Sequence, residues 1–285
     1  MIHTALFEAA KRLTHSDSPR LDAEILLCHV LGVARSYLYT WPDKMLTPIQ
    51  LKQFQALLTR RIQGEPIAYL TGRKEFWSLE LQVTENTLIP RPDTELLVEQ
   101  VLARLPPDSQ VQIVDLGTGS GAIALAIAQE RPFCHILATD KSMAALKVAR
   151  ANAQNLGFHQ IAFLMSDWWA ALGDIKATLI VSNPPYIAKD DPHLTRGGVQ
   201  YEPRCALIAE EEGLANIRQL IVGALQHLVT QGWLLLEHGY DQAEAVRELF
   251  IQYGYESVTT YKDLAGLSRV TVGLLNNLCE LSKKP

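Results

Sequence analysis

The sequence predicts an α/β fold in which a mainly parallel sheet is covered by helices on both faces. Three observations lead to this prediction. From Pro92 onward, short β-branched apolar runs alternate with longer helical patterns, as expected where each strand is joined to the next by a helix. The first of these runs leads into a glycine-rich loop, and several later runs end in polar residues. A chain of 285 residues is long enough for one such domain and a smaller second one.

The N-terminal part predicts a small bundle of three to five short helices. Ser18-Pro19 and Thr47-Pro48 each place an N-cap residue before a proline, which suits the first helical position. The apolar residues that follow recur at helical spacing, and the two helices are expected to end near Gly32 and Gly64. Their apolar faces need only each other, so a plain bundle without chemistry is the simplest interpretation.

A β-hairpin is predicted between this bundle and the larger domain. Residues 76–83 alternate between apolar and polar side chains, and Thr84-Glu85-Asn86 has the composition of a turn. We therefore expect residues 1–75 to form the helical domain, residues 76–90 the linking hairpin and residues 91–285 the large domain.

The strands predicted for the large domain are apolar, and four of them end in candidate functional residues. In a parallel sheet these ends meet at one edge, where ligands bind. The four strands are followed by three more, and helices are expected near 212–229 and 241–253. The predicted strands are 111–115, 135–140, 161–167, 177–182, 232–237, 256–261 and 269–272.

The loop after the first strand predicts a site for a nucleotide-like ligand. Asp115 ends the strand, and the glycines of the segment 117–121 allow a sharp turn and a close approach of backbone to ligand. The third glycine comes one residue earlier than in dinucleotide-binding loops, and no Lys-Ser or Lys-Thr pair is present to hold a triphosphate. An acidic residue before such a loop suits a cationic, amino-acid-like ligand end, as in S-adenosylmethionine. Packing alone is the alternative role for this loop.

The next two strands end in residues that could hold the rest of this ligand. Asp140 could accept hydrogen bonds from both ribose hydroxyls, although it could equally cap the helix that starts near Ser142. Asp167 ends the third strand and Trp168 follows it, and the two could bracket an adenine by hydrogen bonding and stacking. Because Trp169 follows directly, an amphipathic anchor in the core is the alternative for this pair.

The tetrapeptide Asn183-Pro184-Pro185-Tyr186, after the fourth strand, is the most informative motif of the chain. Its prolines remove two backbone donors and fix φ, which leaves nearby carbonyl groups free to accept. These carbonyl groups, the side-chain oxygen of Asn183 and the ring of Tyr186 together suit the binding of a planar amino group whose nitrogen is exposed for chemistry. A proline-rich turn that ends the strand is the alternative.

Together these motifs resemble those of class I S-adenosylmethionine-dependent methyltransferases that act on a planar nitrogen. More narrowly, the chain is similar to the bacterial protein-(glutamine-N5) methyltransferases of the PrmC/HemK family, which modify class I peptide-chain release factors. At Ser268 the family more often has an acidic or amide residue. The narrower resemblance covers essentially the full length and rests on further segments, namely 64–72, Phe76-Trp77, 88–95, Tyr201-Glu202-Pro203, Ala206-Leu207 and 262–270.

The resemblance implies a Rossmann-like sheet of seven strands, closed by a pair of strands at the C-terminus. It also implies that S-adenosyl-L-methionine donates a methyl group to the N5 amide nitrogen of the Gln in the Gly-Gly-Gln loop of a release factor. The helical domain would bind this partner, and residues 90–95 would lie over the methionine end of the cofactor. Asn183, Pro184 and Tyr186 are the expected catalytic residues, and with Pro185 they are expected to bind the substrate. Cofactor contacts are expected from Gly117, Thr118, Gly119, Ser120, Gly121, Asp140, Trp168 and Asn183.

The expected chemistry depends on orientation. An amide nitrogen is a poor nucleophile because its lone pair is delocalised, whereas a sulfonium methyl is already activated. We expect the Asn183 side-chain oxygen and the Pro184 carbonyl each to accept one N–H of the Gln amide and to aim its nitrogen at the methyl. The methylated nitrogen is very acidic, so no general base is expected, and His238 is interpreted as structural. No metal is expected.

Two other functions stay open. The exocyclic amines of adenine and guanine present the same two donors, so N-methylation of DNA or RNA is the main alternative. That function predicts a basic face with interleaved aromatic residues. The formal net charge is −5, and the basic clusters Arg60-Arg61 and Arg73-Lys74 are small. A cofactor-binding scaffold without catalysis is the third possibility, although Asn183 and Pro184 are both intact.

Composition indicates a cytoplasmic protein. The four cysteines have neither metal-ligand nor redox spacing and are expected to be reduced thiols; they are Cys28, Cys134, Cys205 and Cys279. No apolar run approaches the ~18 residues of a membrane span, and the N-terminus lacks a signal-peptide pattern. We therefore expect a monomeric enzyme that contacts neither a membrane nor a specific nucleic-acid sequence.

Overall fold

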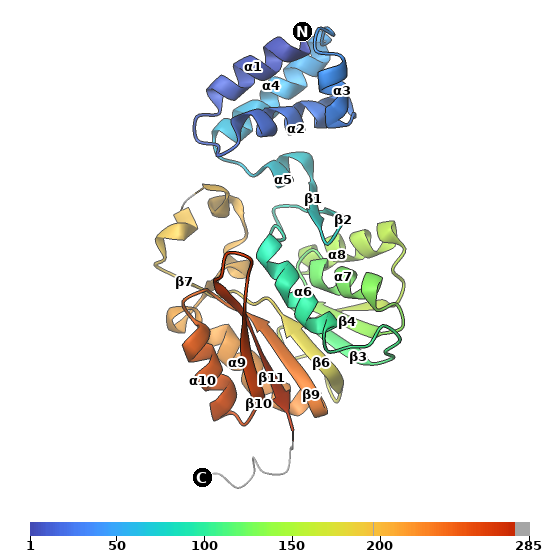
Figure 1. Cartoon of the computed structure of the whole chain (residues 1–285), viewed down its shortest axis with the longest axis vertical. Helices are drawn as coiled ribbons and strands as arrows, with labels where there is room; N and C mark the ends of the chain where they lie inside the picture. Colours follow the sequence, from blue (N-terminus) through green and yellow to red (C-terminus); the bar gives the residue numbers. More distant parts are fainter. Residues whose placement is uncertain (196, 277–285) are drawn as a thin grey trace. The chain divides into compact units, whose positions relative to one another are not determined.

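Figure 1 shows the computed structural model of the chain, which describes residues 1–195 and 197–276. Two compact units are present in this part of the chain. The first consists of Met1–Arg73 with Thr195–Tyr201, and the second of Lys74–Leu194 with the described residues from Glu202 onward. Cys279, one of the expected reduced thiols, lies outside the described residues. Within them, no helix has the length and apolar character that a membrane crossing requires.

The first unit is a bundle of short helices, as predicted. Its core contains fully buried side chains from several helices, among them Leu26, Phe54 and Leu58. A capping box begins the longest helix, since Thr47 Oγ1 accepts the backbone N–H of Gln50 at 3.2 Å. The helices of this unit are α1 (Ile2–Arg12), α2 (Pro19–Leu31), α3 (Arg35–Thr40), α4 (Pro48–Ile62) and α5 (Ile67–Thr71).

A short segment from the second half of the sequence also belongs to the first unit. Thr195–Tyr201, which includes the 3-10 helix η3 (Gly197–Tyr201), packs with the bundle instead of the large unit. The Tyr201 hydroxyl donates to the Gln63 carbonyl at 2.8 Å. The prediction had assigned residues 91–285 to the large domain without interruption. The local pattern of apolar residues could not predict that this later segment packs with the N-terminal helices, because it carries no information on contacts between distant segments.

The linking hairpin lies earlier than the predicted 76–90. Its strands are β1 (Arg73–Phe76) and β2 (Leu79–Gln82), joined by Trp77 and Ser78. Both turn residues are left-handed, with φ of 52° and 59°, which is the geometry of a tight two-residue hairpin turn. Asn and Gly are the residues that usually mark this turn, so the Trp-Ser pair gave no local indication of it.

The second unit confirms the predicted fold class. Seven strands of the described chain form its main sheet, in the order β10-β11-β9-β6-β3-β4-β5. All neighbours from β9 to β5 are parallel, and β11 is antiparallel to both β9 and β10. The strands are β3 (Gln112–Leu116), β4 (His135–Asp140), β5 (Ile161–Met165), β6 (Ala177–Ser182), β9 (Leu228–Glu237), β10 (Glu256–Lys262) and β11 (Ser268–Leu275).

Helices cover both faces of this sheet (Figure 1). Two apolar clusters lie in this unit, one containing Ile113 of β3 and the other containing the next residue, Val114. Because successive side chains of a strand point to opposite faces and both of these are fully buried, the sheet is covered on both faces. The first cluster includes residues of α6 (Glu95–Leu102), α7 (Ala122–Glu130) and α8 (Met143–Leu156). The second includes residues of α9 (Ala215–His227) and α10 (Ala243–Gln252).

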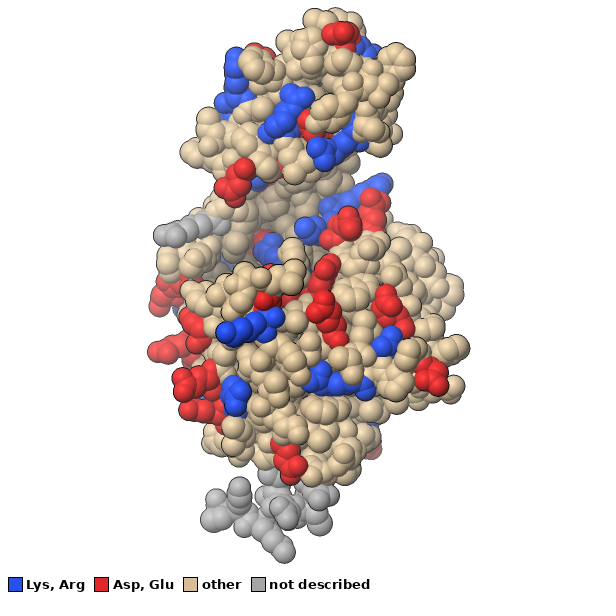
Figure 2. Space-filling view, viewed as in Figure 1, with Lys and Arg blue, Asp and Glu red and all other residues tan. Residues whose placement is uncertain are grey.

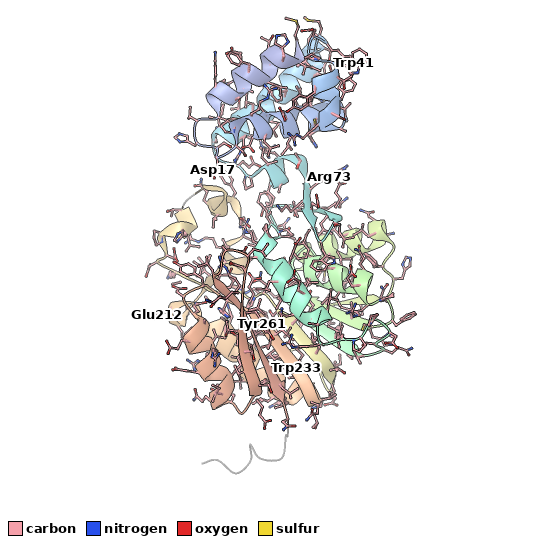
Figure 3. The ribbon with its side chains drawn as sticks, viewed as in Figure 1. Asp17, Trp41, Arg73, Glu212, Trp233 and Tyr261 are labelled. Atoms are coloured by element: carbon pink, nitrogen blue, oxygen red, sulfur yellow. The ribbon has the colours of Figure 1, made fainter. Side chains whose placement is uncertain are left out.

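An arginine after α6 stacks on two aromatic residues of the sheet. Trp233 on β9 and Tyr261 on β10 lie near one another in Figure 3. The Arg104 guanidinium carbon lies 4.7 Å from the Trp233 ring centroid and 5.5 Å from that of Tyr261. This contact holds α6, and with it the segment that precedes α6, against the sheet. That segment contributes to the site described next.

Candidate active site

A cavity of about 950 Å³, counting its open mouth, lies at the carboxyl ends of the parallel strands. Four successive strands of the sheet deliver residues to it, as expected for an open α/β sheet. The predicted residues that line it are Gly117, Thr118, Gly119, Ser120, Asp140, Trp168, Asn183 and Pro185. Three other predicted residues do not line it: Gly121, Pro184 and Tyr186.

The glycine-rich loop after β3 forms the floor of the cavity. Gly117 and Gly119 are left-handed, with φ of 75° and 58°, a region that side chains disfavour. The backbone N–H groups of Gly117 and Thr118 both donate to the Thr139 carbonyl, which fixes the loop against β4. A Cβ on Gly121 would lie 3.1 Å from Leu125 and 3.2 Å from Ala149. Gly121 therefore allows close helix packing and does not line the cavity, and its contact with the cofactor stays a prediction.

Asp115 lies beneath this loop and is not exposed. Its Oδ2 accepts the Thr118 hydroxyl at 2.6 Å, while Oδ1 is buried and has no hydrogen-bond partner among the described residues. Burial raises the pKa of Asp115 to about 7, and the charge of Asp140 adds to this effect. Any influence of Asp115 on a ligand must therefore pass through the loop.

Asp140 supports the start of α8 and also lines the cavity, and its contact with ribose hydroxyls stays a prediction. Its Oδ1 accepts the N–H of Ser142 at 2.8 Å, at the start of α8, and its Oδ2 accepts the N–H of Gly119 at 2.9 Å. It also lines the cavity. Each oxygen keeps a lone pair for a further donor. Burial raises the pKa of Asp140, and the backbone hydrogen bonds partly offset this effect.

The two adjacent tryptophans, Trp168 and Trp169, have different surroundings. Trp168 lines the cavity in a left-handed conformation, with φ of 49°, and its ring lies against Gly117, where a Cβ would approach it to 3.3 Å. Ser166 supports this conformation by donating to the Trp168 carbonyl at 2.8 Å. Trp169 instead stacks on His227, with ring centroids 4.9 Å apart. One tryptophan is thus available to a ligand, and the other packs against α9.

Asn183 is held at the cavity by Thr94, which belongs to the segment 90–95 expected over the methionine end of the cofactor. Its Nδ2 donates to Thr94 Oγ1 at 3.1 Å. Thr94 ends the 3-10 helix η1 (Pro92–Thr94), and it lines the cavity together with Arg91. In the described chain, neither Asn183 Oδ1 nor the Pro184 carbonyl accepts a hydrogen bond. The two predicted acceptors are therefore available, whereas the Pro185 carbonyl accepts from Asn216 at 3.0 Å.

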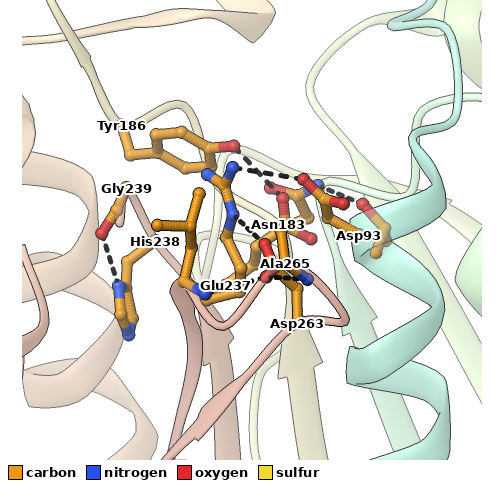
Figure 4. Close-up of polar contacts among 11 residues, drawn as sticks. Asp93, Asn183, Tyr186, Glu237, His238, Gly239, Asp263 and Ala265 are labelled. Atoms are coloured by element: carbon orange, nitrogen blue, oxygen red, sulfur yellow. Dashed lines mark hydrogen bonds and ion pairs between the residues drawn. The ribbon is translucent and has the colours of Figure 1, made fainter. Parts of the chain in front are cut away.

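Tyr186 is not among the residues that line the cavity. Its hydroxyl donates to Glu237 Oε1 at 3.2 Å, as Figure 4 shows. Burial raises the pKa of both groups, for Glu237 to about 7. The backbone carbonyl of Tyr186 accepts from Gln242 at 3.0 Å. In the described chain Tyr186 thus contacts Glu237 and Gln242, and its packing against a substrate amide stays a prediction.

His238 takes no part in the cavity. Its Nδ1 lies 2.8 Å from the Gly239 carbonyl, and its Nε2 lies 2.8 Å from the Thr271 hydroxyl. Burial lowers the pKa of His238, so the ring is kept neutral. These contacts agree with the structural role expected for it.

A wall that the sequence did not predict comes from the long connection between β6 and α9. Pro203, Cys205 and Ala206 line the cavity there. Glu202, 4% exposed, anchors this wall by accepting the N–H of Ile89 at 3.1 Å and by pairing with Arg91. The only indication in the sequence was the resemblance of the Tyr201-Glu202-Pro203 segment to a known family.

Two family models match parts of this chain. Residues 4–72 match the family model for the PrmC N-terminal domain, and residues 92–196 match that for the methyltransferase small domain. A methyltransferase from Pyrococcus furiosus has a similar structure, with a TM-score of 0.52 over 77% of this chain and 98% of that one. At 18% identity, this likeness supports the fold alone.

Sequence relatives are more specific. The release factor glutamine methyltransferase of Escherichia coli K12 is 53% identical over 94% of this chain and 96% of its own length. The protein of the same name from Vibrio cholerae is 50% identical over 95% of this chain and 96% of its own length. This chain therefore belongs to the release factor glutamine methyltransferase family.

Proposed function

We propose that this protein transfers a methyl group from S-adenosyl-L-methionine to the N5 amide nitrogen of the Gln in the Gly-Gly-Gln loop of class I peptide-chain release factors. The observation that carries this proposal is the orientation of Asn183. Because its Nδ2 is engaged by Thr94 at 3.1 Å, its Oδ1 is left to accept an N–H from a planar amide. Family membership supports the choice of acceptor.

The residues that line the cavity suit S-adenosylmethionine. Asp140 has a spare lone pair on each oxygen for the ribose hydroxyls, and Trp168 offers a ring face to the adenine. A Cβ placed on Gly119 would meet no atom within 4 Å, so the loop leaves space for the methionine end. A cation above the loop would also favour the ionised form of the buried Asp115 carboxylate. When bound, the cofactor supplies an activated sulfonium methyl.

The chain's own residues then position the acceptor. Asn183 Oδ1 and the Pro184 carbonyl each accept one N–H of the Gln amide, which aims the nitrogen lone pair at the methyl. Both acceptors also stabilise the positive charge that develops on this nitrogen in the transition state. The nitrogen loses its proton after methylation without a dedicated base. Tyr186 contributes through its contacts behind the site.

The domain roles are part of the same proposal. The helical unit binds the release factor, the hairpin of β1 and β2 links it, and the large unit carries out methyl transfer. The enzyme acts as a cytoplasmic monomer. Figure 2 shows that acidic and basic side chains are interspersed on the face in view, without the continuous basic stripe that a nucleic-acid substrate would favour.

Methyl transfer from labelled S-adenosylmethionine to a purified class I release factor tests the proposal. A release factor in which the loop Gln is replaced by Ala and a duplex DNA serve as parallel acceptors. We expect label on the release factor and none on its Gln-to-Ala variant. Label on DNA alone would overturn the proposal in favour of an exocyclic amine, and the absence of label on every acceptor would favour a scaffold.

A further inference from the structure

We infer that Arg91 binds the carboxylate of the methionine part of S-adenosylmethionine, and that Glu202 orients its guanidinium group for this role. The inference deepens the proposed function and rests on it. Arg91 lines the cavity but lies outside both the glycine-rich loop and the Asn-Pro-Pro-Tyr motif. The family resemblance implied only that residues 90–95 lie over the methionine end of the cofactor, and it gave none of them a ligand.

The Arg91 guanidinium has hydrogen-bond donors that no residue of the described chain uses. Its Nη2 pairs with Glu202 Oε1, and neither Nε nor Nη1 makes a hydrogen bond or an ion pair there. Nη2 carries two hydrogens, one on each edge of the planar group, and Glu202 takes only one of them. One complete edge therefore remains, which is the geometry that binds a carboxylate through two parallel hydrogen bonds.

Glu202 keeps this guanidinium at the cavity. The side chain of Glu202 is 1% exposed, whereas that of Arg91 is 37% exposed. Glu202 Oε2 accepts the N–H of Ile89 at 3.1 Å, so the carboxylate is tied to the backbone two residues before Arg91. A carboxylate buried to this degree is costly without a cation, and this cost holds the Arg91 side chain in place before a ligand arrives. The guanidinium is thus oriented and still accessible from the cavity.

Arg91 lies at the end of the cavity where methyl transfer is proposed. Its carbonyl accepts the N–H of Thr94 at 3.1 Å, and Thr94 Oγ1 accepts from Asn183 Nδ2 at 3.1 Å. The methionine part of the cofactor begins at the sulfonium, so it must lie close to the methyl group that is transferred beside Asn183. Lys141, the second cation among the described residues that line the cavity, directly follows Asp140 at the proposed ribose site. Arg91 is therefore the cation suited to the carboxylate.

The charge of the cofactor separates a direct contact from a general attraction. S-adenosylmethionine carries a sulfonium and an ammonium group but only one carboxylate, so it is a cation overall. Removing a cation from the cavity should by itself favour such a ligand. Asp140 and Asp167 also line the cavity and would repel a carboxylate that had no cation beside it. A weaker affinity without Arg91 would therefore indicate a lost contact with the carboxylate and not an effect of net charge.

The Kd values of two ligands test this contact in the full-length enzyme without any acceptor. Titration calorimetry compares S-adenosylmethionine with decarboxylated S-adenosylmethionine, which lacks only the carboxylate. The unmodified enzyme should bind the second compound about 10- to 100-fold more weakly, as expected for a lost pair of charge-assisted hydrogen bonds. Arg91→Gln should weaken the binding of S-adenosylmethionine by a similar factor. The same variant should bind the decarboxylated compound as well as the unmodified enzyme does, or more tightly.

Three further variants separate this contact from effects on folding and charge. Arg91→Gln leaves the Glu202 carboxylate buried without its cation. The double variant Arg91→Gln/Glu202→Gln removes both charges, and it should show the same selective loss with a Tm close to that of the unmodified enzyme. Glu202→Gln alone, which frees the Arg91 side chain, should show a smaller loss that is also selective for S-adenosylmethionine. Lys141→Gln removes a cation from the same cavity and is the matched control, which should change the Kd of both compounds by the same factor.

Equal weakening of both compounds in Arg91→Gln would overturn the inference, as would a loss selective for S-adenosylmethionine in Lys141→Gln. Unchanged binding of both compounds in Glu202→Gln would overturn the orienting role of Glu202. Label transfer to a release factor tests the proposed function separately. A selective loss in an enzyme that methylates no release factor would uphold the inference and refute the proposed acceptor. An unmodified enzyme that binds neither compound would overturn both.

Discussion

The side chain of Asn152 hydrogen-bonds to both backbone groups of Gln82, at 2.7 Å to the N–H and 3.0 Å to the carbonyl. Its nitrogen also donates to the Ser120 carbonyl at 2.9 Å. Asn152 is 1% exposed, so these bonds have no competition from water. One buried amide thus joins the hairpin strand β2, the helix α8 and the loop that forms the floor of the cavity.

Replacing Asn152 by Asp should lower the free energy of unfolding by about 2 to 4 kcal/mol, because two carbonyls lose their donor and a charge is buried. Asn155→Asp, at an exposed position of the same helix, is the control and should change it by less than about 0.5 kcal/mol. Urea unfolding followed by circular dichroism measures both. Equal stability of the two variants would show that the Asn152 contacts contribute nothing.

Asp140→Asn should weaken the binding of S-adenosylmethionine about 10-fold or more, since an amide nitrogen cannot accept from Gly119 or from a ribose hydroxyl. Titration calorimetry gives the Kd directly. Asp174→Asn, exposed and outside the cavity, removes the same charge and should leave the Kd unchanged. If both variants bound S-adenosylmethionine equally weakly, the loss of affinity would come from the change in net charge and not from a lost ribose contact.

The fold and part of the site were predictable because both follow from local pattern. Apolar runs that alternate with helices indicate a parallel sheet, and the polar residues at the strand ends must then meet at one edge. Asp140, Trp168 and Asn183 were identified in this way, and all three line the cavity. Where one residue had two interpretations, only the structure could show that Asp140 accepts the N–H of Ser142, the N-cap residue of α8, and lines the cavity at once.

The remaining features of the fold and the site depend on contacts between distant segments, which leave no pattern in the local sequence. Thr94 meets Asn183 across 89 positions, and Tyr186 meets Glu237 across 51. The Thr195–Tyr201 segment joins the helical unit for the same reason. The hairpin was misplaced on other grounds, because its left-handed turn uses Trp77 and Ser78 where glycine or asparagine is usual.

Cys205 should be the cysteine whose alkylation blocks the cavity. It lines the cavity and is exposed, whereas Cys134 is buried and burial raises the pKa of the Cys28 thiol. N-ethylmaleimide should therefore lower S-adenosylmethionine binding, and bound cofactor should slow the modification of Cys205 as read by mass spectrometry. Cys205→Ser should bind the cofactor normally and resist the reagent. A Cys205→Ser enzyme that is inhibited equally would place the sensitive thiol elsewhere.

The stability of the cofactor-free protein should depend on the ionisation of Asp115. Burial raises the pKa of Asp115 to about 7 in the folded protein, whereas an unfolded aspartate titrates near about 3.9. The folded state therefore binds this proton more tightly. Its contribution to stability is complete below about pH 4 and is lost as the pH rises to about 7. Asp115→Asn cannot titrate and should keep its stability over this range.

The Tm of Asp115→Asn minus that of the unmodified protein isolates this group, because every other titration is shared by both proteins. The difference should grow from pH 4 to pH 7 and then level off, with Asp174→Asn showing no such trend. Saturating S-adenosylmethionine should make this Tm difference less dependent on pH, since a cation above the loop favours the ionised carboxylate. A difference that stays constant with pH would mean that Asp115 is already ionised beneath the loop. Its unpartnered Oδ1 would then need a donor that the loop does not provide.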